Sequence, residues 1–453
     1  MSEAERGWYP DYVWRGGRVE SGVALFADHA GIIRRFSSDP ADLERATRLR
    51  DCAIVPGFVN AHSHAFQRAI RGRVEERSNA GTDSFWTWRE AMYRAANYLT
   101  PDQIYTVSRM AFLEMLLAGI TTVGEFHYLH HEPDGTRYSD PNLLAKTVIR
   151  AAADTGLRIV LLRTAYARAG FEKEPNLRQR RFITPDPEQF LLDSADLQSA
   201  LSGTASIGIA PHSVRAVPLA YLEQCAAYAR TQNLPLHMHV AEQPAEIEAC
   251  RAEYGSRPFE LLAAHGILAH NFTAVHATHT TDQEIAAMAR AKANICACPT
   301  TERNLGDGIA PAHKWAASGI HVSFGSDSNV QIDLLEDARE LEYHLRLQQL
   351  SRAILPAEKL LEFATRGGAR SLCTAAGELE PGRPADFSVF DLNHVSIAGA
   401  DRASLAAQIV FAAQRGAIRE VYVAGQRIIS EARHKDQEPI TAAFLQVQRS
   451  LWD

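Results

Sequence analysis

The chain has 453 residues, of which 46% are hydrophobic and 22% are charged, a composition typical of a folded globular protein. This length fits one large domain with a smaller second domain. The formal net charge of −7 argues against a general nucleic-acid binder, because such proteins need a basic surface to neutralise phosphates. No run approaches the roughly 20 apolar residues of a membrane span. The six cysteines are scattered along the chain, which favours reduced thiols and a cytoplasmic location.

The two ends of the chain share a strand-and-turn pattern. Near the start, YVWRGGRVESGVALF combines short strand-like pieces with turn residues. A similar pattern returns in ADFSVFDL and REVYVAGQRII, where AGQ is typical of a hairpin turn. We expect residues 1–54 and 378–435 to pair into a small β-sandwich domain, and residues 436–453 to form a C-terminal helix.

Between these ends, residues 55–377 alternate between strand-like and helical stretches. Helical patterns cover stretches such as 102–118, 218–232 and 333–350. Short apolar runs rich in β-branched residues lie at 52–64, 119–129, 157–167, 205–213, 234–242, 272–279, 293–300 and 319–328. This alternation predicts parallel strands joined by crossover helices, and continuous apolar runs are typical of strands covered on both sides. Eight such units predict a catalytic (β/α)8 barrel, with an open doubly wound sheet as the alternative.

Histidines and acids gather at the carboxyl ends of these runs, where a barrel enzyme builds its active site. They include His62, His64, Glu125, His127, His212, His237, His239, Glu242, His276, His279 and Asp327. Residues i and i+2 of a strand point to the same face, so His62 and His64 are able to converge on one ion. His237 and His239 share a face in the same way, which leaves either residue as a candidate ligand.

Four motifs occur in order along the chain: PGFVNAHSH, HVAE, VHATH and FGSDS. With ELEPGRPADFSVFDL, they resemble the amidohydrolase superfamily, and its deaminase branch in particular, over nearly the whole chain. The resemblance implies that one divalent metal ion, with zinc expected, is bound by the side chains of His62, His64, His239 and Asp327. The end of the fourth strand, APHSVR, lacks the lysine that bridges two metals in other branches, which favours a single ion. A homodimer is also expected from the resemblance.

Within that branch, HSHAFQRAIRG, SFWTWRE, GEFHYLHH and APHSVRAVP resemble the formimidoylglutamate deiminase family. The resemblance implies hydrolysis of N-formimino-L-glutamate to N-formyl-L-glutamate and ammonia, a reaction of histidine degradation. A metal-bound hydroxide is expected to attack the formimino carbon. Glu242 is then the proton shuttle, while His276 and Asp327 stabilise the intermediate and help to move the second proton.

A small anionic substrate with two carboxylates needs donors at the mouth of the barrel. Arg215, just past the fourth strand, is the first candidate, because arginine binds a carboxylate through two parallel hydrogen bonds. Gln67, Tyr128 and His212 are candidates for single hydrogen bonds. Arg89, in the aromatic-rich SFWTWRE stretch, is a candidate contact from a lid.

Two other functions stay open. The first is a deaminase acting on a purine, pterin or triazine-like ring, whose pocket would need aromatic stacking and amide donors. Arg215 and the shortage of a clear stacking motif argue mildly against it. The second is a non-catalytic barrel that serves as a scaffold. A scaffold has no need of four metal ligands together with Glu242 and His276.

Overall fold

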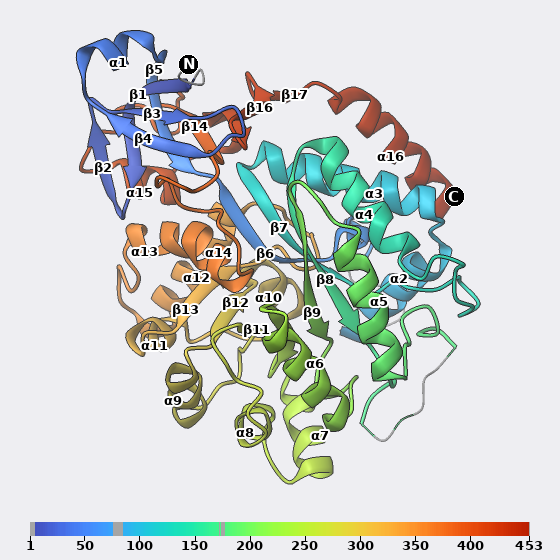
Figure 1. Ribbon diagram of the computed structural model, residues 1–453. Helices are drawn as coiled ribbons and strands as arrows, with labels where there is room; N and C mark the ends of the chain where they lie inside the picture. The colour runs from blue at the N-terminus through green and yellow to red at the C-terminus, as the bar shows by residue number, and fades with distance from the viewer. Residues whose placement is uncertain (1–4, 76–84, 172, 174–176, 453) are drawn as a thin grey trace.

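The computed structural model describes residues 5–75, 85–171, 173 and 177–452, and two sheets organise them (Figure 1). One sheet has eight strands and belongs to the barrel; the other has nine strands and is built from both ends of the chain. Among the described residues, no helix has the length and apolar character needed to cross a membrane.

The eight-stranded sheet confirms the predicted (β/α)8 barrel. Its strands are β6 (Phe58–Ser63), β7 (Ile120–His127), β8 (Arg158–Ala165), β9 (Ala205–Pro211), β10 (Leu236–Val240), β11 (Phe272–His276), β12 (Asn294–Ala297) and β13 (His321–Phe324). Each strand lies inside one of the eight apolar runs, and neighbouring strands pair in parallel. Almost all of their side chains are buried, which accounts for runs without polar alternation.

The barrel closes between β6 and the segment that follows β13. The Asp327 backbone N–H donates to the His62 carbonyl at 3.0 Å, and the His64 backbone N–H donates to the Asp327 carbonyl at 3.0 Å. A single parallel bridge joins Ser63 to Asp327. The closure therefore lies at the level of the predicted metal ligands.

Helices surround the barrel (Figure 1). Those between or after the strands are the 3₁₀ helix η1 (Ala65–Ile70), α2 (Phe85–Tyr98), α3 (Pro101–Leu117), α4 (Leu143–Thr155), α5 (Pro187–Ser199), α6 (Leu219–Thr231), α7 (Pro244–Tyr254), α8 (Pro258–Ala264), α9 (Asp282–Ala291), α10 (Pro299–Leu305), α11 (Ala312–Ala317), α12 (Leu334–Gln349), α13 (Ala357–Glu362), the π-helical turn η2 (Phe363–Gly367) and α14 (Gly368–Ser371). Helix α3 illustrates the local signals for helix formation. Thr100 and Gln103 form a reciprocal capping box at its N-terminus, and Pro101 is its first residue.

The nine-stranded sheet joins the two chain ends. It contains β1 (Arg6–Arg15), β2 (Arg18–Ser21), β3 (Ala24–Ala27), β4 (Ile33–Ser37), β5 (Thr47–Pro56), β14 (Phe387–Asp391), β15 (Ile418–Val423), β16 (Gln426–Ser430) and β17 (Arg433–His434). Strand β14 pairs antiparallel with β5, which connects the C-terminal strands to the N-terminal ones. The AGQ turn joins β15 to β16, with Ala424 and Gly425 at positive φ. The remaining helices of this part are α1 (Pro40–Arg45), α15 (Leu405–Phe411) and the 3₁₀ turn η3 (Arg415–Ala417).

The apolar run 52–64 is divided between the two sheets. Its first part belongs to β5 and its second part to β6, with Gly57 between them. A Cβ at Gly57 would lie 2.1 Å from Thr121 Oγ1, so only glycine fits where the chain passes from one sheet to the other. This close approach brings the NAHSH segment to the start of the barrel.

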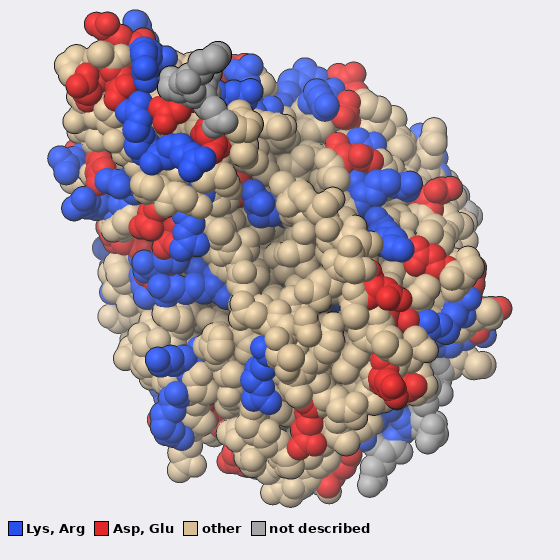
Figure 2. Space-filling view, in the orientation of Figure 1, with Lys and Arg blue, Asp and Glu red and all other residues tan. Residues whose placement is uncertain are grey.

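The chain ends in α16 (Gln437–Trp452), within the predicted C-terminal helix. The helix packs along α3, and the Trp452 indole N–H donates to the Ala69 carbonyl at 3.1 Å. Basic and acidic side chains are interspersed on the face shown in Figure 2, around a broad area without charged residues.

Candidate active site

Four buried side chains meet at the closure of the barrel. One ligand atom each from His62, His64, His239 and Asp327 lies within 4.8 Å of all the others. Asp327 Oδ1 is 3.2 Å from Nε2 of His62 and 3.2 Å from Nε2 of His64. Ligand atoms held about 2.0–2.1 Å from a tetrahedral ion lie roughly 3.4 Å apart, so these spacings fit a metal centre.

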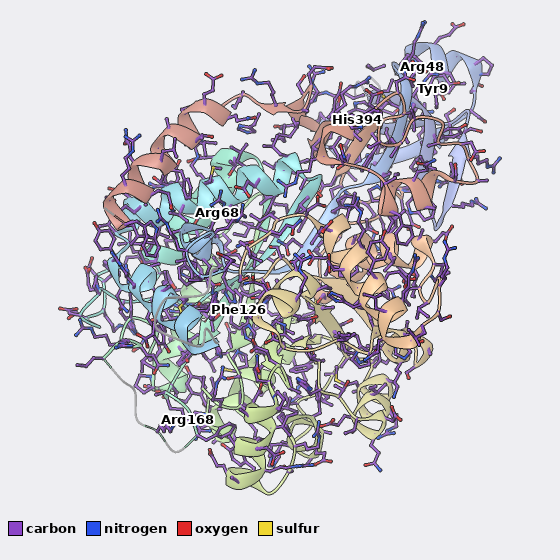
Figure 3. All side chains as sticks on the ribbon, turned by 180° about the vertical axis from the view of Figure 1, so that it is seen from behind. Tyr9, Arg48, Arg68, Phe126, Arg168 and His394 are labelled. Atoms are coloured by element: carbon purple, nitrogen blue, oxygen red, sulfur yellow. The ribbon has the colours of Figure 1, made fainter. Side chains whose placement is uncertain are left out.

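The imidazoles are oriented by the surrounding backbone. Nδ1 of His64 donates to the Phe126 carbonyl at 3.0 Å, and Nδ1 of His239 donates to the His212 carbonyl at 3.1 Å. Both Nε2 atoms are therefore unprotonated in the neutral rings and available to an ion. Phe126, labelled near the centre of the barrel in Figure 3, packs edge-on against the rings of His62, His64 and His239. Neither ring nitrogen of the buried His62 has a hydrogen-bond partner among the described residues, which again suits a bound cation.

Burial also sets the charge of these ligands. It lowers the pKa of His62 to about 3 and that of His239 well below its ordinary value, so both rings are neutral near pH 7. Burial alone would raise the pKa of Asp327, but the adjacent imidazoles of His62, His64 and His276 hold it well below its usual range. Neutral imidazoles and an ionised carboxylate are the protonation states that metal coordination requires.

Glu242 and His276 lie beside the four ligands. His276 Nε2 is 3.9 Å from Glu242 Oε1 and 3.7 Å from Asp327 Oδ2, and it has no hydrogen-bond partner within the described part of the chain. The backbone takes positive φ at His276 (69°), Ala277 (53°) and Asp327 (43°), which is uncommon for residues other than glycine. These turns lie where the side chains of His276 and Asp327 approach each other.

Two cysteines of the apolar run 293–300, Cys296 and Cys298, are buried. Cys296 lies in β12, whereas Cys298 stands at the start of α10. Cys298 Sγ also falls within 4.8 Å of ligand atoms of His276 and Asp327. Its side chain therefore belongs to the surroundings of the site, a placement that the sequence did not indicate.

A cavity opens above the ligands, and four predicted substrate contacts line it: Gln67, Tyr128, His212 and Arg215. Gln67 Nε2 donates to the Tyr128 hydroxyl at 3.0 Å, which leaves the buried Gln67 Oε1 without a partner among the described residues. Arg89 belongs to α2, but its side chain lies outside the described residues, so the lid contact stays a prediction.

Arg215 is the buried cation of this cavity. Its Nε has no hydrogen-bond partner in the described part of the protein. Burial alone would lower the pKa of the guanidinium, but the nearby carboxyls of Glu246 and Glu242 raise it above its ordinary value. Burial in turn raises the pKa of Glu246 to about 7. A charged donor that keeps an unused N–H in a cavity is suited to an anionic ligand.

Aromatic side chains that the sequence did not single out complete the cavity. They are Trp88, Tyr93, Tyr166 and Phe182. Gln179 donates to the hydroxyls of Tyr93 and Tyr166 at 2.9 and 3.0 Å, which fixes both rings. Tyr166 directly follows β8, so its place at the end of the third strand could have identified it. Tyrosine is neither a histidine nor an acid, and it was therefore not among the residues considered there. Tyr93 comes from α2, and no local pattern distinguishes it.

The other rim histidines are held by the protein itself. His237 Nε2 donates to the Ser371 carbonyl at 2.7 Å, and His279 Nε2 donates to the Asp307 carbonyl at 2.8 Å. His130 donates to the Thr164 carbonyl at 2.8 Å. His239, rather than His237, is therefore the residue of β10 that joins the ligand group.

Comparison with known proteins identifies the family of the chain. The model of the amidohydrolase family matches residues 53–428. The chain belongs to the amidohydrolase family. Formimidoylglutamate deiminase of Pseudomonas aeruginosa is 39% identical over 99% of both chains. A 5-methylthioadenosine/S-adenosylhomocysteine deaminase of Syntrophomonas wolfei is 28% identical, over 88% of this chain and 86% of the relative.

Two solved structures share the fold closely. An amidohydrolase from Brucella melitensis superposes with a TM-score of 0.91 at 34% identity, over 99% of this chain and 100% of that one. Atrazine chlorohydrolase from Arthrobacter aurescens TC1, complexed with zinc, superposes with a TM-score of 0.85 at 25% identity, over 98% and 99% of the two chains. The protein is thus a member of the deaminase branch and a hydrolase acting on carbon–nitrogen bonds. The family is metal-dependent, and the His/Asp group supplies a fitting set of ligands.

Proposed function

We propose that the protein hydrolyses N-formimino-L-glutamate to N-formyl-L-glutamate and ammonia, the deamination step of histidine degradation. The observation that carries this proposal is Arg215, a buried guanidinium whose Nε has no partner among the described residues and which lines the same cavity as His64, His239 and Asp327. A dicarboxylate substrate gives that charge a partner. The similarity to formimidoylglutamate deiminase over 99% of the chain supports the same substrate.

One zinc ion per subunit is the proposed cofactor, held by His62, His64, His239 and Asp327. Three imidazoles and one carboxylate suit zinc, and the buried His62 nitrogens, which lack partners in the described part of the chain, suit a cation at this position. Bound zinc would lower the pKa of a water molecule to about 7 and so make a nucleophile available at neutral pH.

The chain's own residues then move the protons. In the proposed reaction, water adds to the formimino carbon, and Glu242 accepts its proton and delivers it to the departing nitrogen. His276 Nε2 faces Glu242 and Asp327, where a hydrogen bond stabilises the oxygen of the tetrahedral intermediate. Asp327 helps to transfer the second proton. The carbon–nitrogen bond breaks, ammonia leaves, and a formyl group remains on the glutamate.

The substrate carboxylates are proposed to contact the far wall of the cavity. Arg215 binds one carboxylate with charge-assisted hydrogen bonds, whereas Gln67, Tyr128 and His212 offer single hydrogen bonds. Arg89 remains the candidate contact from a lid. A homodimer and a cytoplasmic location stay predictions and are checked by light scattering and by fractionation of cells.

Deamination of a ring substrate is the second candidate function. The aromatic side chains of Trp88, Tyr93, Tyr166 and Phe182 favour it, because such rings stack on planar ligands. Similarity to 8-oxoguanine deaminase of Pseudomonas aeruginosa, 28% identical over 80% of this chain, points the same way. A non-catalytic scaffold is disfavoured, since Glu242 and His276 accompany a complete set of metal ligands.

Ammonia release distinguishes these functions. Zinc-loaded protein is assayed with N-formimino-L-glutamate, S-adenosylhomocysteine, 8-oxoguanine and a triazine, and bound metal is quantified in parallel. We expect turnover of the first compound at a kcat/KM at least 100-fold above the others, with one zinc per subunit. Turnover of a ring compound alone would contradict the proposed substrate, and absence of metal after zinc loading would contradict the catalytic assignment.

A further inference from the structure

The two ring nitrogens of His276 have different surroundings. Nε2 faces the cavity between Glu242 and Asp327, as described above. Nδ1 lies on the other side of the ring, 3.3 Å from Oε1 of Glu302. Both residues are buried, with 1% of His276 and 3% of Glu302 exposed. Among the described residues, Glu302 is the only hydrogen-bond partner of this imidazole.

Glu302 is itself held in place by the start of α10. Its Oε1 accepts the backbone N–H of Cys298 at 2.8 Å. The same oxygen therefore joins the first turn of α10 to the His276 ring. The contact between Glu302 and His276 is thus part of a fixed arrangement between the end of β11 and α10. Glu302 is a buried and anchored carboxylate, not an exposed one.

We propose that Glu302 is a positioning residue for His276. Its carboxylate accepts the Nδ1–H of the ring and keeps Nε2 directed into the cavity toward Glu242 and Asp327. A carboxylate that orients an imidazole in this way is a general device in metal centres and in hydrolases. This inference rests on the proposed deamination, in which His276 stabilises the intermediate.

The backbone alone does not fix the ring. His276 and Ala277 both have positive φ, so the chain turns sharply at this point, and the side chain needs an anchor beyond its own strand. The neighbouring His239 ring stacks on His276 with centroids 5.5 Å apart, which limits tilt but leaves rotation by half a turn about the Cβ–Cγ bond. The hydrogen bond that His276 Nδ1–H donates to Glu302 selects one of these two orientations.

Two substitutions separate the hydrogen bond from packing. Glu302→Gln keeps an amide oxygen that accepts both the Cys298 N–H and the His276 Nδ1–H, whereas Glu302→Ala removes the acceptor. Asp337→Asn is the matched control. Asp337 is equally buried and anchors the same turn, because its Oδ1 accepts from the backbone N–H and the hydroxyl of Thr300 at 3.0 and 2.8 Å. It does not contact His276.

Steady-state kinetics use whichever compound of the ammonia panel the wild type converts, so a wrong substrate assignment does not affect this test. For Glu302→Ala we expect kcat to fall on the order of 100-fold, with KM within about threefold and zinc content unchanged. Glu302→Gln should recover at least tenfold of that loss, and Asp337→Asn should keep kcat within about threefold. A wild-type kcat in Glu302→Ala, no recovery in Glu302→Gln, or an equal loss in Asp337→Asn would overturn the proposal.

Nuclear magnetic resonance gives a readout that is independent of turnover. In zinc-loaded protein labelled with 15N-histidine, we expect a protected Nδ1–H signal, assigned to His276 by its loss in His276→Gln. The signal should persist in Glu302→Gln and disappear in Glu302→Ala. Its absence from the wild type, or its persistence in Glu302→Ala, would show that Glu302 does not hold this proton.

Discussion

Replacement of Arg215 by methionine tests how the protein recognises an anionic substrate. Methionine has a similar length and an apolar stem, so it fills the position without offering a donor. Arg215 Nε has no partner among the described residues, which leaves at least one N–H for a substrate carboxylate. One charge-assisted hydrogen bond contributes about 1.5–3 kcal/mol, which corresponds to a loss of roughly 10- to 150-fold in kcat/KM.

The loss should appear mainly in KM. The proposed carboxylate lies away from the reacting carbon, so it is bound equally in the ground state and in the transition state. Removing the cation also leaves Glu246, whose pKa burial raises to about 7, without its nearest positive charge. Arg215→Met is therefore compared with Arg215→Met/Glu246→Gln, which removes both members, and with Arg215→Lys, which keeps the charge but lacks the planar pair of donors.

Two analogues identify the contact. N-formimino-4-aminobutyrate lacks the α-carboxylate of the substrate, and N-formimino-2-aminobutyrate lacks the γ-carboxylate. The analogue that lacks the carboxylate bound by Arg215 should be hydrolysed equally well by wild type and variant, while the other analogue shows the full loss. The reasoning is refuted if Arg215→Met changes kcat/KM less than threefold, or if both analogues lose as much as the substrate while zinc content is normal.

Three further predictions concern the metal ligands, the proton shuttle and a buried acid. Glu242→Gln should keep zinc but lower kcat by about 10²- to 10⁴-fold, whereas Glu246→Gln should stay near wild type; full activity of Glu242→Gln would remove its role. Chelation of the metal should lower the unfolding temperature, and zinc at 100 times its Kd should restore about 2.7 kcal/mol of the free energy of unfolding. Thermal scans with metal analysis should show that His239→Gln loses this response to zinc and that His237→Gln keeps it. Burial raises the pKa of Glu125 from 4.5 to about 7, so the folded state retains a proton that the unfolded chain releases. The free energy of unfolding should therefore fall by about 3 kcal/mol between roughly pH 4.5 and 7, and Glu125→Gln should flatten that dependence in denaturant titrations; parallel pH profiles of the two proteins would contradict it.

Much of the metal site follows from local sequence patterns. The spacing of His62 and His64 is a property of one strand, and the eight apolar runs place His239 and Asp327 at the same end of a barrel. Local patterning could not decide between His237 and His239, because both share a face of β10. In the structure, His237 donates to the carbonyl of Ser371, which lies 134 residues away in the sequence. This contact leaves His239 as the candidate ligand.

The residues that sequence analysis missed come from helices or carry unexpected chemistry. Glu302 lies on α10, after a strand whose end shows no histidine, and it resembles any other helical acid until its distance to His276 is known. Tyr93 enters the cavity from α2. Periodicity identifies which face of a helix is buried but not which residue on that face reaches a cavity, since this depends on the angle between helix and barrel.

The metal site is also the seam of the barrel, which couples its chemistry to the fold. A bridge at Ser63 and Asp327 and two backbone hydrogen bonds between Asp327 and the histidine segment join β6 to the segment after β13. Side chains reinforce this seam, because Asn60 Nδ2 donates to the Ser326 hydroxyl at 2.7 Å and Asn329 Nδ2 donates to the His64 carbonyl at 2.9 Å. His62 from β6, His64 just after it and Asp327 from the segment after the last strand are thus brought together by the same contacts that close the sheet. An ion bound to all of them adds a cross-link across the seam, so metal affinity and barrel stability should rise and fall together.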